Sequence, residues 1–282
     1  MPEPVNDASW ADILPSPARV PFLAYKYRHH IHRSWQKVAA TFPWSPTEVA
    51  VTGRPSTGKS LFVSALDHTN REFDFTPPGV STGVETAVFN VGPWARIVRT
   101  IPGQQSKERA DGLNNAIIHN PNLMGVIHVV DWGYTWERVP ELRERLVKED
   151  GVDTIQKLRE RNLQLEIADY TSILEIVRQT WAKFKRPKWV FVAVNKADLF
   201  PEKMTEAQRY YSPLMDSQFT KPLIQLRQNV GADNMRFGAA PVCSWEENFE
   251  WNGEIERSRI GGTTASKNLM HEFARRLAQI AE

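Results

Sequence analysis

Short, mainly apolar segments recur along the chain, separated by segments that are apolar only at every third or fourth position. The two clearest, 124–131 and 189–195, are continuous and rich in β-branched residues, which is typical of central strands in a parallel sheet covered on both faces. Further strands are predicted at 47–53, 84–91 and 95–101, with a weaker one at 235–243. Strands that alternate with helices favour an α/β fold: a doubly wound, mostly parallel sheet flanked by helices.

Helical periodicity accounts for most of the remaining sequence. Apolar side chains repeat at helical spacing from residue 21 to 42, which predicts an N-terminal helix after a proline-containing arm. A terminal helix is predicted at 263–281, and a helical insertion at about 135–186, where the connection is longer than one crossover helix needs. We therefore divide the chain into an N-terminal arm and helix, 1–46, and an α/β domain, 47–282.

Composition narrows the classes of partner. The chain has 282 residues, of which 41% are hydrophobic, so it is globular rather than disordered. A net charge of +2 gives no reason to expect nucleic acid as a partner. A single cysteine excludes an intramolecular disulfide and argues against a Cys/His zinc cluster. The chain lacks a long apolar stretch and a signal-peptide core, so we expect a cytoplasmic protein.

Basic and aromatic residues are mixed in the sequence YKYRHHIHRSW (25–35), within the predicted N-terminal helix. A basic amphipathic helix can bind a membrane surface or a protein partner. The favoured interpretation is that its apolar stripe packs on the α/β domain while its charges are solvated. Membrane binding is the less favoured alternative.

The sequence GRPSTGKS (53–60) matches the phosphate-loop pattern G-x-x-x-x-G-K-[ST] and lies between a predicted strand and a predicted helix. Gly53 and Gly58 allow the backbone to curl so that its N–H groups can face phosphate oxygens. Lys59 would reach the β- and γ-phosphates, and the Ser60 hydroxyl would bind Mg²⁺. The motif predicts a nucleotide site without specifying the base.

The sequence NKAD (195–198) ends the apolar strand 189–195. It is similar to the Asn-Lys-x-Asp motif that reads guanine at this place in the sheet of GTPases. The resemblance implies that Asp198 would accept hydrogen bonds from guanine N1–H and its exocyclic amine, which adenine cannot supply. It also implies that Asn195 would brace the loop and face the base, and that the stem of Lys196 would lie over the ring. A buried carboxylate left without these donors would disfavour adenine. The sequence CSW (243–245) follows the next strand, and the backbone N–H at Ser244 could meet guanine O6.

The order and approximate spacing of GRPSTGKS, TIPGQ (100–104), NKAD and CSW resemble those of the Ras/Arf-like small GTPases. The resemblance covers residues 47–282 apart from the helical insertion. It implies a P-loop NTPase fold of the Ras-like type, with GTP or GDP as ligand and Mg²⁺ as cofactor. It also implies a first switch loop whose threonine binds Mg²⁺. Thr82 is the candidate for this role and Thr86 the alternative.

Thr100 stands where the family normally has the Asp of an Asp-x-x-Gly motif. A hydroxyl can still bind a water of Mg²⁺, so we expect weaker metal binding rather than none. The form T-x-P-G-Q is similar to the second-switch motif of bacterial Mgl-type polarity GTPases. Gly103 would sense the γ-phosphate and Gln104 would orient the attacking water, with Gln105 as the alternative. An internal arginine cannot be assigned from sequence; Arg54 and Arg99 are the candidates.

The resemblance thus implies a complete set of site residues. The predicted catalytic residues are Gln104 and Lys59, and the predicted metal ligands are Ser60 and Thr82. The predicted nucleotide contacts are Gly53, Ser56, Thr57, Gly58, Lys59, Ser60, Leu61, Gly103, Asn195, Lys196, Asp198, Cys243 and Ser244.

Three functions remain open at the level of sequence. The favoured one is a GTP-binding molecular switch with slow, partner-activated hydrolysis, which binds protein effectors in its GTP state and is reset by an activating protein. The second is a nucleotide-bound structural subunit that hydrolyses little or no GTP, for which Thr100 is the argument. The third, an ATPase of another phosphate-loop class, conflicts with the role predicted for Asp198. A homodimer or larger complex is compatible with each.

Overall fold

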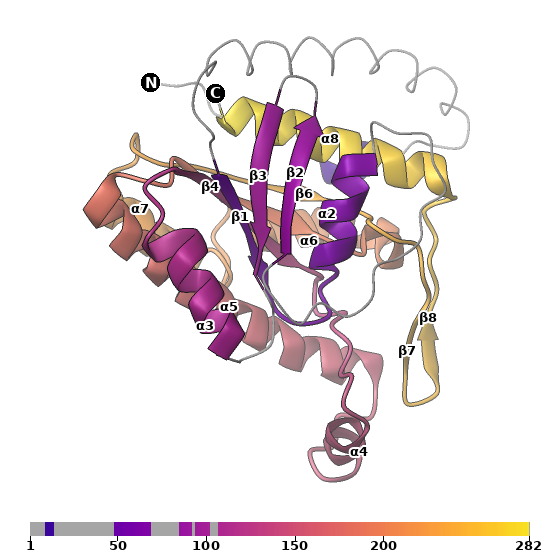
Figure 1. Ribbon diagram of the computed structural model, residues 1–282. Coiled ribbons are helices and arrows are strands. Elements are labelled where there is room, and N and C mark those ends of the chain that lie inside the picture. The colour runs from indigo at the N-terminus through magenta and orange to yellow at the C-terminus, as the bar shows by residue number, and fades with distance from the viewer. Residues whose placement is uncertain (1–8, 14–47, 69–84, 92–93, 102–106, 282) are drawn as a thin grey trace.

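A six-stranded sheet forms the centre of the computed structural model (Figure 1). The structure describes residues 9–13, 48–68, 85–91, 94–101 and 107–281. The strands, in sheet order, are β2 (Glu85–Val91), β3 (Trp94–Thr100), β1 (Glu48–Gly53), β4 (Leu123–Val130), β5 (Trp189–Val194) and β6 (Arg236–Pro241). Only β2 is antiparallel to its neighbour, so the predicted α/β class with a mostly parallel sheet is confirmed.

Helices cover both faces of the sheet, as the continuously apolar strands predict. On β1, Val49 and Val51 join a core with Phe62 of α2 (Lys59–His68) and Phe273 of α8 (Thr263–Ala281). Ala50 lies between these valines and belongs to the core on the opposite face. Because successive strand residues point to opposite faces, a strand buried on both sides is apolar throughout. The terminal helix has the predicted bounds.

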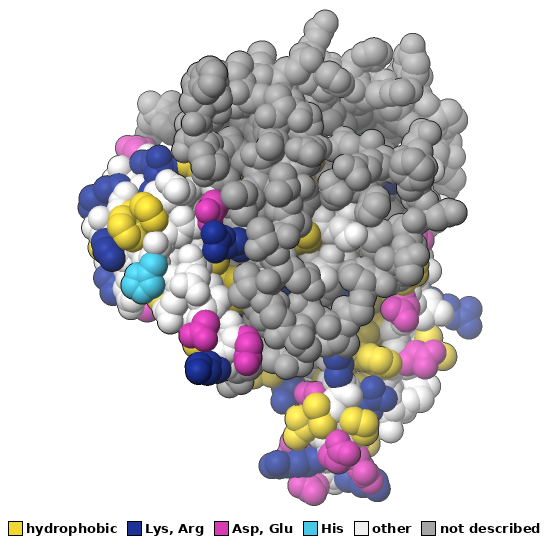
Figure 2. All heavy atoms as spheres, viewed as in Figure 1, with side chains coloured by type: hydrophobic (Ala, Val, Ile, Leu, Met, Phe, Trp, Pro, Cys, Tyr) yellow, Lys and Arg dark blue, Asp and Glu magenta, His cyan; other side chains and the backbone are white. Residues whose placement is uncertain are grey.

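The helices on the second face include α3 (Lys107–Leu113), α5 (Ile155–Phe184), α6 (Met204–Tyr211) and α7 (Lys221–Val230). The range of the predicted helical insertion holds α4 (Pro140–Lys148) and the 30-residue helix α5. Residues of α5 contact β1 and α7, so this helix packs on the sheet and serves as the crossover from β4 to β5. By contrast, α4 projects from the body, and its surface carries mixed charges and exposed hydrophobic side chains (Figures 1 and 2).

Several short elements complete the described chain. The helical turn η1 (Trp10–Asp12) places the fully buried Trp10 in the second core, where its N–H donates to Gln208 Oε1 at 2.9 Å. The π-turn η2 (Asn114–Ile118) extends α3, and the turns η3 (Ala197–Leu199) and η4 (Pro201–Lys203) lead into α6. The hairpin of β7 (Phe249–Trp251) and β8 (Glu254–Glu256) was not predicted from sequence.

The order of the strands determines where a ligand can bind. The chain moves from β1 to one side of the sheet, through β2 and β3, and then returns to the other side of β1 at β4. In open α/β sheets, ligands bind at such a reversal, beyond the carboxyl ends of the strands. The phosphate loop follows β1 at this edge, and the segment that begins at Asp131 follows β4. Among the described residues, no helix is long and apolar enough to cross a membrane.

Candidate guanine-nucleotide site

The phosphate loop leaves β1 in a conformation that only its glycines allow without strain. Gly53 has φ +140° and Gly58 has φ +84°. A Cβ on Gly53 would lie 2.3 Å from the Val129 carbonyl oxygen, and one on Gly58 would lie 2.4 Å from Asn195 Nδ2. Thr57 Oγ1 donates to the Arg54 carbonyl at 3.0 Å and closes the turn. Ser56 Oγ is buried without a hydrogen-bond partner in the described part of the chain, as in a cradle that has room for an anion.

Lys59, the first residue of α2, turns back across the loop. Its Nζ donates to the carbonyl oxygens of Gly53 at 3.0 Å and Arg54 at 2.7 Å. Burial, reinforced by the nearby charges of Arg109 and Arg138, lowers the pKa of Lys59 from 10.5 to about 7. An anion in the loop would offset both causes, so the site favours a ligand with negative charge.

This shift predicts proton uptake when a nucleotide binds. With a pKa near 7, Lys59 is about nine-tenths neutral at pH 8, and bound phosphate would raise its pKa and protonate it. Affinity for GDP should therefore fall as pH rises above 7, by up to about tenfold per pH unit. Isothermal titration calorimetry at pH 8, in buffers of different ionisation enthalpy, should show uptake of close to one proton. The phosphates of GDP are already ionised there, because phosphoryl groups have a second pKa near 6.

Titration at pH 6 is the control: Lys59 is then largely protonated before binding, so proton uptake should disappear, and the GDP phosphate, with a second pKa near 6, should release protons instead. If the binding enthalpy at pH 8 does not depend on the buffer, no proton is taken up, and this result would contradict the role of Lys59 in binding the phosphates.

Asn195 joins the phosphate loop to the loop that follows β6. Its Nδ2 donates to the Thr57 carbonyl at 2.9 Å, and its Oδ1 accepts from the Ser244 backbone N–H at 3.1 Å. The side chain is buried and lies against Gly58. Since this Ser244 N–H already binds Asn195, a contact with guanine O6 would have to share the donor. Three motifs that are far apart in the sequence therefore meet at one amide group.

Asp198 lies at the other end of the same site, in the turn η3. Its carboxylate accepts from Cys243 Sγ at 3.4 Å and from the Glu247 backbone N–H at 3.4 Å. Burial raises the pKa of Asp198 above its usual value, while these hydrogen bonds act in the opposite direction. The Ser258 hydroxyl is a further donor to this carboxylate, so a ligand that donates to Asp198 would share the carboxylate with three protein donors.

Lys196 connects the NKAD turn to the chain that follows β4. It has the left-handed φ of +58°, and its Nζ donates to Asp131 Oδ2 at 2.8 Å and to the Tyr134 carbonyl. Asp131 is fully buried and also accepts from Thr135 Oγ1 at 2.7 Å. The lysine predicted to lie over a base is therefore tied to the segment 131–139, which we call the β4–α4 segment.

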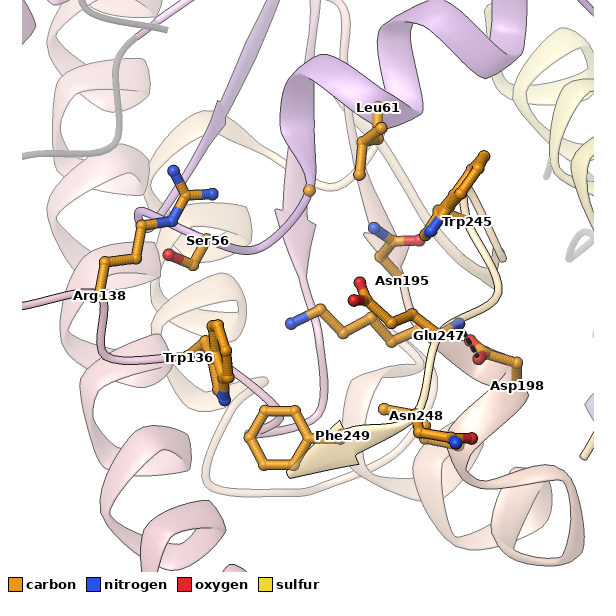
Figure 3. Close-up of a pocket in the computed structure, with 13 residues that line it drawn as sticks. Ser56, Leu61, Trp136, Arg138, Asn195, Asp198, Trp245, Glu247, Asn248 and Phe249 are labelled. Atoms are coloured by element: carbon orange, nitrogen blue, oxygen red, sulfur yellow. Dashed lines mark hydrogen bonds between the residues drawn. The ribbon is translucent and has the colours of Figure 1, made fainter. Parts of the chain in front are cut away.

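Residues from all these elements surround one cavity of about 180 Å³ (Figure 3). Of the residues predicted from sequence, it is lined by Ser56, Gly58, Leu61, Asn195, Lys196 and Asp198. The sequence analysis did not assign the remaining lining residues, Trp136, Arg138, Leu199, Trp245, Glu247, Asn248 and Phe249. The phosphate loop and Arg138 lie at one end of the cavity, whereas Asp198 and Trp245 lie at the other (Figure 3). The cavity thus has a cationic end and an end that can read a base.

Some predicted site residues cannot be placed. Thr82, Gly103, Gln104 and Gln105 lie outside the described residues, and so do the side chain of Thr86 and the N-terminal helix 21–42. Thr100 is described: it pairs in register with Val51 of β1, two residues before Gly53, and is buried. Its Oγ1 has no hydrogen-bond partner among the described residues. A buried hydroxyl beside the phosphate loop fits a contact with metal-bound water.

No protein-family model matches the chain, and no curated protein matches it in sequence. Solved structures do match. The signal recognition particle receptor SRb-GTP/SRX complex from Chaetomium thermophilum is 15% identical, with 72% of this chain and 93% of that chain covered and a TM-score of 0.40. The small COPII coat GTPase SAR1 from Encephalitozoon cuniculi in complex with GDP is 14% identical, covering 92% and 90%, with a TM-score of 0.40.

Toc33 from Arabidopsis thaliana, in complex with GDP and Mg²⁺, is 10% identical, with 96% of both chains covered and a TM-score of 0.44. Likenesses with TM-scores below 0.5 carry no argument about the activity of this chain. The assignment of the fold therefore rests on the strand order and direction described above, and the proposal of a function rests on the contacts around the cavity.

Proposed function

We propose that this chain is a GTP-binding molecular switch that uses Mg²⁺ and hydrolyses GTP to GDP and phosphate. The observation that carries the proposal is the pair of hydrogen bonds made by Asn195, at 2.9 Å to Thr57 and at 3.1 Å to Ser244. They bring a phosphate loop and a candidate base-reading turn to the two ends of one cavity. The cationic groups at one end and the buried carboxylate at the other give this cavity the polarity that a nucleoside phosphate requires.

The base end supports guanine. Asp198 is buried, and its carboxylate could accept from guanine N1–H and from the C2 amine, neither of which adenine has. The exposed ring of Trp245 and the stem of Lys196 line the same end and provide apolar faces for a base. Discrimination against adenine would come mainly from its N1, an acceptor that would face the carboxylate where guanine offers a donor.

The phosphate end supports a bound metal. Ser60 is the second residue of α2, next to Lys59, where a hydroxyl can bind Mg²⁺, and Thr82 is the second proposed ligand. When bound, Mg²⁺ would neutralise charge on the β- and γ-phosphates. The buried Thr100 hydroxyl would orient a metal-bound water, Gly103 would sense the γ-phosphate, and Gln104 would orient the attacking water. Effector binding in the GTP state and stimulation by an activating protein complete the proposal.

Thr100 also supports a second candidate, a nucleotide-bound structural subunit with little hydrolysis. A neutral hydroxyl replaces a carboxylate at a point where charge near the metal would help catalysis. The two candidates share the binding site and differ in turnover.

Single-turnover hydrolysis tests the proposal. The purified chain should bind GDP and GTP in preference to ADP and ATP, and release phosphate from GTP at about 10⁻⁴–10⁻² per second without a partner. Gln104→Ala should lower this rate at least about tenfold, because the attacking water loses its orienting group. Gln105→Ala is the matched control and should leave the rate within about twofold.

If Gln105→Ala lowers the hydrolysis rate and Gln104→Ala does not, Gln105 rather than Gln104 orients the attacking water. Guanine nucleotides bound without any phosphate release, even after addition of a cell extract as a source of activators, would favour the structural subunit. Equal affinity for GTP and ATP would contradict the proposed reading of the base.

A further inference from the structure

The β4–α4 segment, residues 131–139, is held rigidly although it forms no helix or strand. Glu166 of α5 accepts from the backbone N–H of Asp131 at 3.3 Å and of Gly133 at 2.9 Å. Asn162 Nδ2 donates to the carbonyls of Gly133 and Thr135, each at 2.9 Å. Hydrogen bonds of this kind from a neighbouring helix hold a loop in one conformation and so help to position its side chains.

Two aromatic contacts extend this anchoring. The Arg159 guanidinium lies 4.2 Å from the ring centre of Trp132 and 4.6 Å from that of Tyr134. Further along, Trp136 Nε1 donates to the Glu250 carbonyl of β7 at 2.8 Å. The segment is therefore held from Asp131 to Trp136, against α5 and against the β7–β8 hairpin, and Arg138 follows two residues after the last of these contacts.

Arg138 projects from this anchored segment at the phosphate end of the cavity. Figure 3 shows its guanidinium on the same side of the cavity as Ser56, opposite Asp198 and Trp245. Its side chain is exposed, and none of the hydrogen bonds or ion pairs among the described residues engages it. A cation that is carried to a phosphate loop on a rigid support, and is left without a protein anion, is suited to bind one from a ligand.

The other arginines near the loop are already engaged. Arg54 Nη1 reaches the Asn162 carbonyl at 3.5 Å, Arg99 Nε pairs with Glu48 at 2.9 Å, and Arg109 pairs with Asp169. The two arginines suggested by the sequence, Arg54 and Arg99, therefore point to protein partners. Lys196 likewise pairs with Asp131 at 2.8 Å, whereas Arg138 has no ion pair among the described residues.

We infer that Arg138 is an arginine supplied by the chain itself to the terminal phosphates of GTP. The inference rests on the proposed function and adds a residue that the family motifs do not include. The guanidinium would bind the γ-phosphate and the bridging β–γ oxygen bidentately, from the solvent side of Ser56.

The hydrolytic step shows why a guanidinium is useful at this position. The water oxygen forms a bond to the γ-phosphorus while the bond from this phosphorus to the β–γ bridging oxygen breaks. The electron pair remains on the bridging oxygen, which becomes a terminal oxygen of GDP, and the protons of the water leave with inorganic phosphate. Negative charge therefore grows on the GDP side, where Arg138 would offset it.

The experiment compares Arg138→Ala and Arg138→Lys with the wild-type chain and with Arg145→Ala. Arg145 lies on the exposed surface of α4 and pairs only with Glu149 among the described residues, at 3.4 Å, so its loss should change neither binding nor turnover. Fluorescence titration with labelled GDP and a labelled non-hydrolysable GTP analogue gives two affinities for each variant. Single-turnover phosphate release and formation of a GDP–aluminium fluoride complex complete the set.

Arg138→Ala should weaken binding of the GTP analogue about tenfold or more relative to GDP, and abolish the aluminium fluoride complex. Its hydrolysis rate should fall by about 10²-fold or more, since arginines in this role contribute 10³–10⁵ in other enzymes. Arg138→Lys should restore part of the affinity but little of the rate, because an ammonium cannot bind two oxygens in one plane.

Wild-type binding separates failure of this inference from failure of the proposed function. If the wild-type chain binds no guanine nucleotide, the proposed function fails and this inference fails with it. If it binds GDP and the GTP analogue, and Arg138→Ala leaves their affinity ratio and the rate within about twofold, only the inference on Arg138 is overturned. Equal weakening of GDP and the GTP analogue would also overturn it, because the contact would then be to a phosphate or ribose group that both share.

Discussion

Asp198→Asn is expected to lower the affinity for GDP by about 100-fold or more and to raise the affinity for xanthosine diphosphate. In the proposed complex, guanine N1–H and its C2 amine both donate to the Asp198 carboxylate. An asparagine amide would place an N–H donor against that amine, whereas xanthine has a carbonyl at C2 that accepts from the same N–H. Sites built on a buried hydrogen bond discriminate strongly, since the wrong partner leaves polar groups unpaired.

Competition titrations with guanosine, xanthosine and adenosine diphosphates measure this change in base preference. Asp153→Asn is the matched control, because Asp153 pairs with Lys157 on the surface at 2.7 Å and is remote in its contacts from the cavity. A variant that keeps its GDP affinity within about threefold would show that Asp198 does not read the base.

Asn195→Ala should lower nucleotide affinity about 100-fold and the free energy of unfolding by about 2–6 kcal/mol. The substitution leaves two buried groups unpaired, the Thr57 carbonyl and the Ser244 N–H, at about 1–3 kcal/mol each. It also removes the side chain against which Gly58 packs, so the phosphate loop loses its brace. Loss of affinity and of stability should therefore occur together.

Urea denaturation, with and without GDP, separates these two effects. Asn234→Ala is the control: Asn234 Nδ2 donates to the Val230 carbonyl at 2.7 Å at the end of α7, and it does not line the cavity. The control should lose about 1 kcal/mol without a change in GDP affinity. Unaltered GDP binding by Asn195→Ala would show that the hydrogen bonds of Asn195 to the two loops do not contribute to nucleotide affinity.

Much of the sheet and of the base-reading end could be predicted because the residues concerned are adjacent in sequence. A phosphate loop needs only a strand, eight residues and a helix, and NKAD ends a strand whose apolar pattern is unambiguous. Parallel strands then bring their carboxyl ends to one edge, so the motifs meet without further information. The roles given to Thr82, Gly103 and Gln104 stay predictions, because these residues lie outside the described part of the chain.

The wall of the cavity on the phosphate side could not be predicted, because the residues that position it are far apart in the sequence. Arg138 is one of many arginines in the sequence, and its position depends on contacts such as that of Trp136 with Glu250, which is 114 residues away. Asp131 stood at the end of a predicted strand, where a polar residue is a useful indication, but its ion pair with Lys196 spans 65 residues. Neither contact leaves a periodic pattern, since both elements are irregular at these points.

Arg159, Asn162 and Glu166 are spaced by three and four residues, so one face of α5 makes all the contacts that it offers to the β4–α4 segment. A shift of one residue along the helix would turn this face by about 100° and break those contacts together. The position of the segment, and with it that of Arg138, therefore depends on the register of α5, a helix about 45 Å long at 1.5 Å per residue.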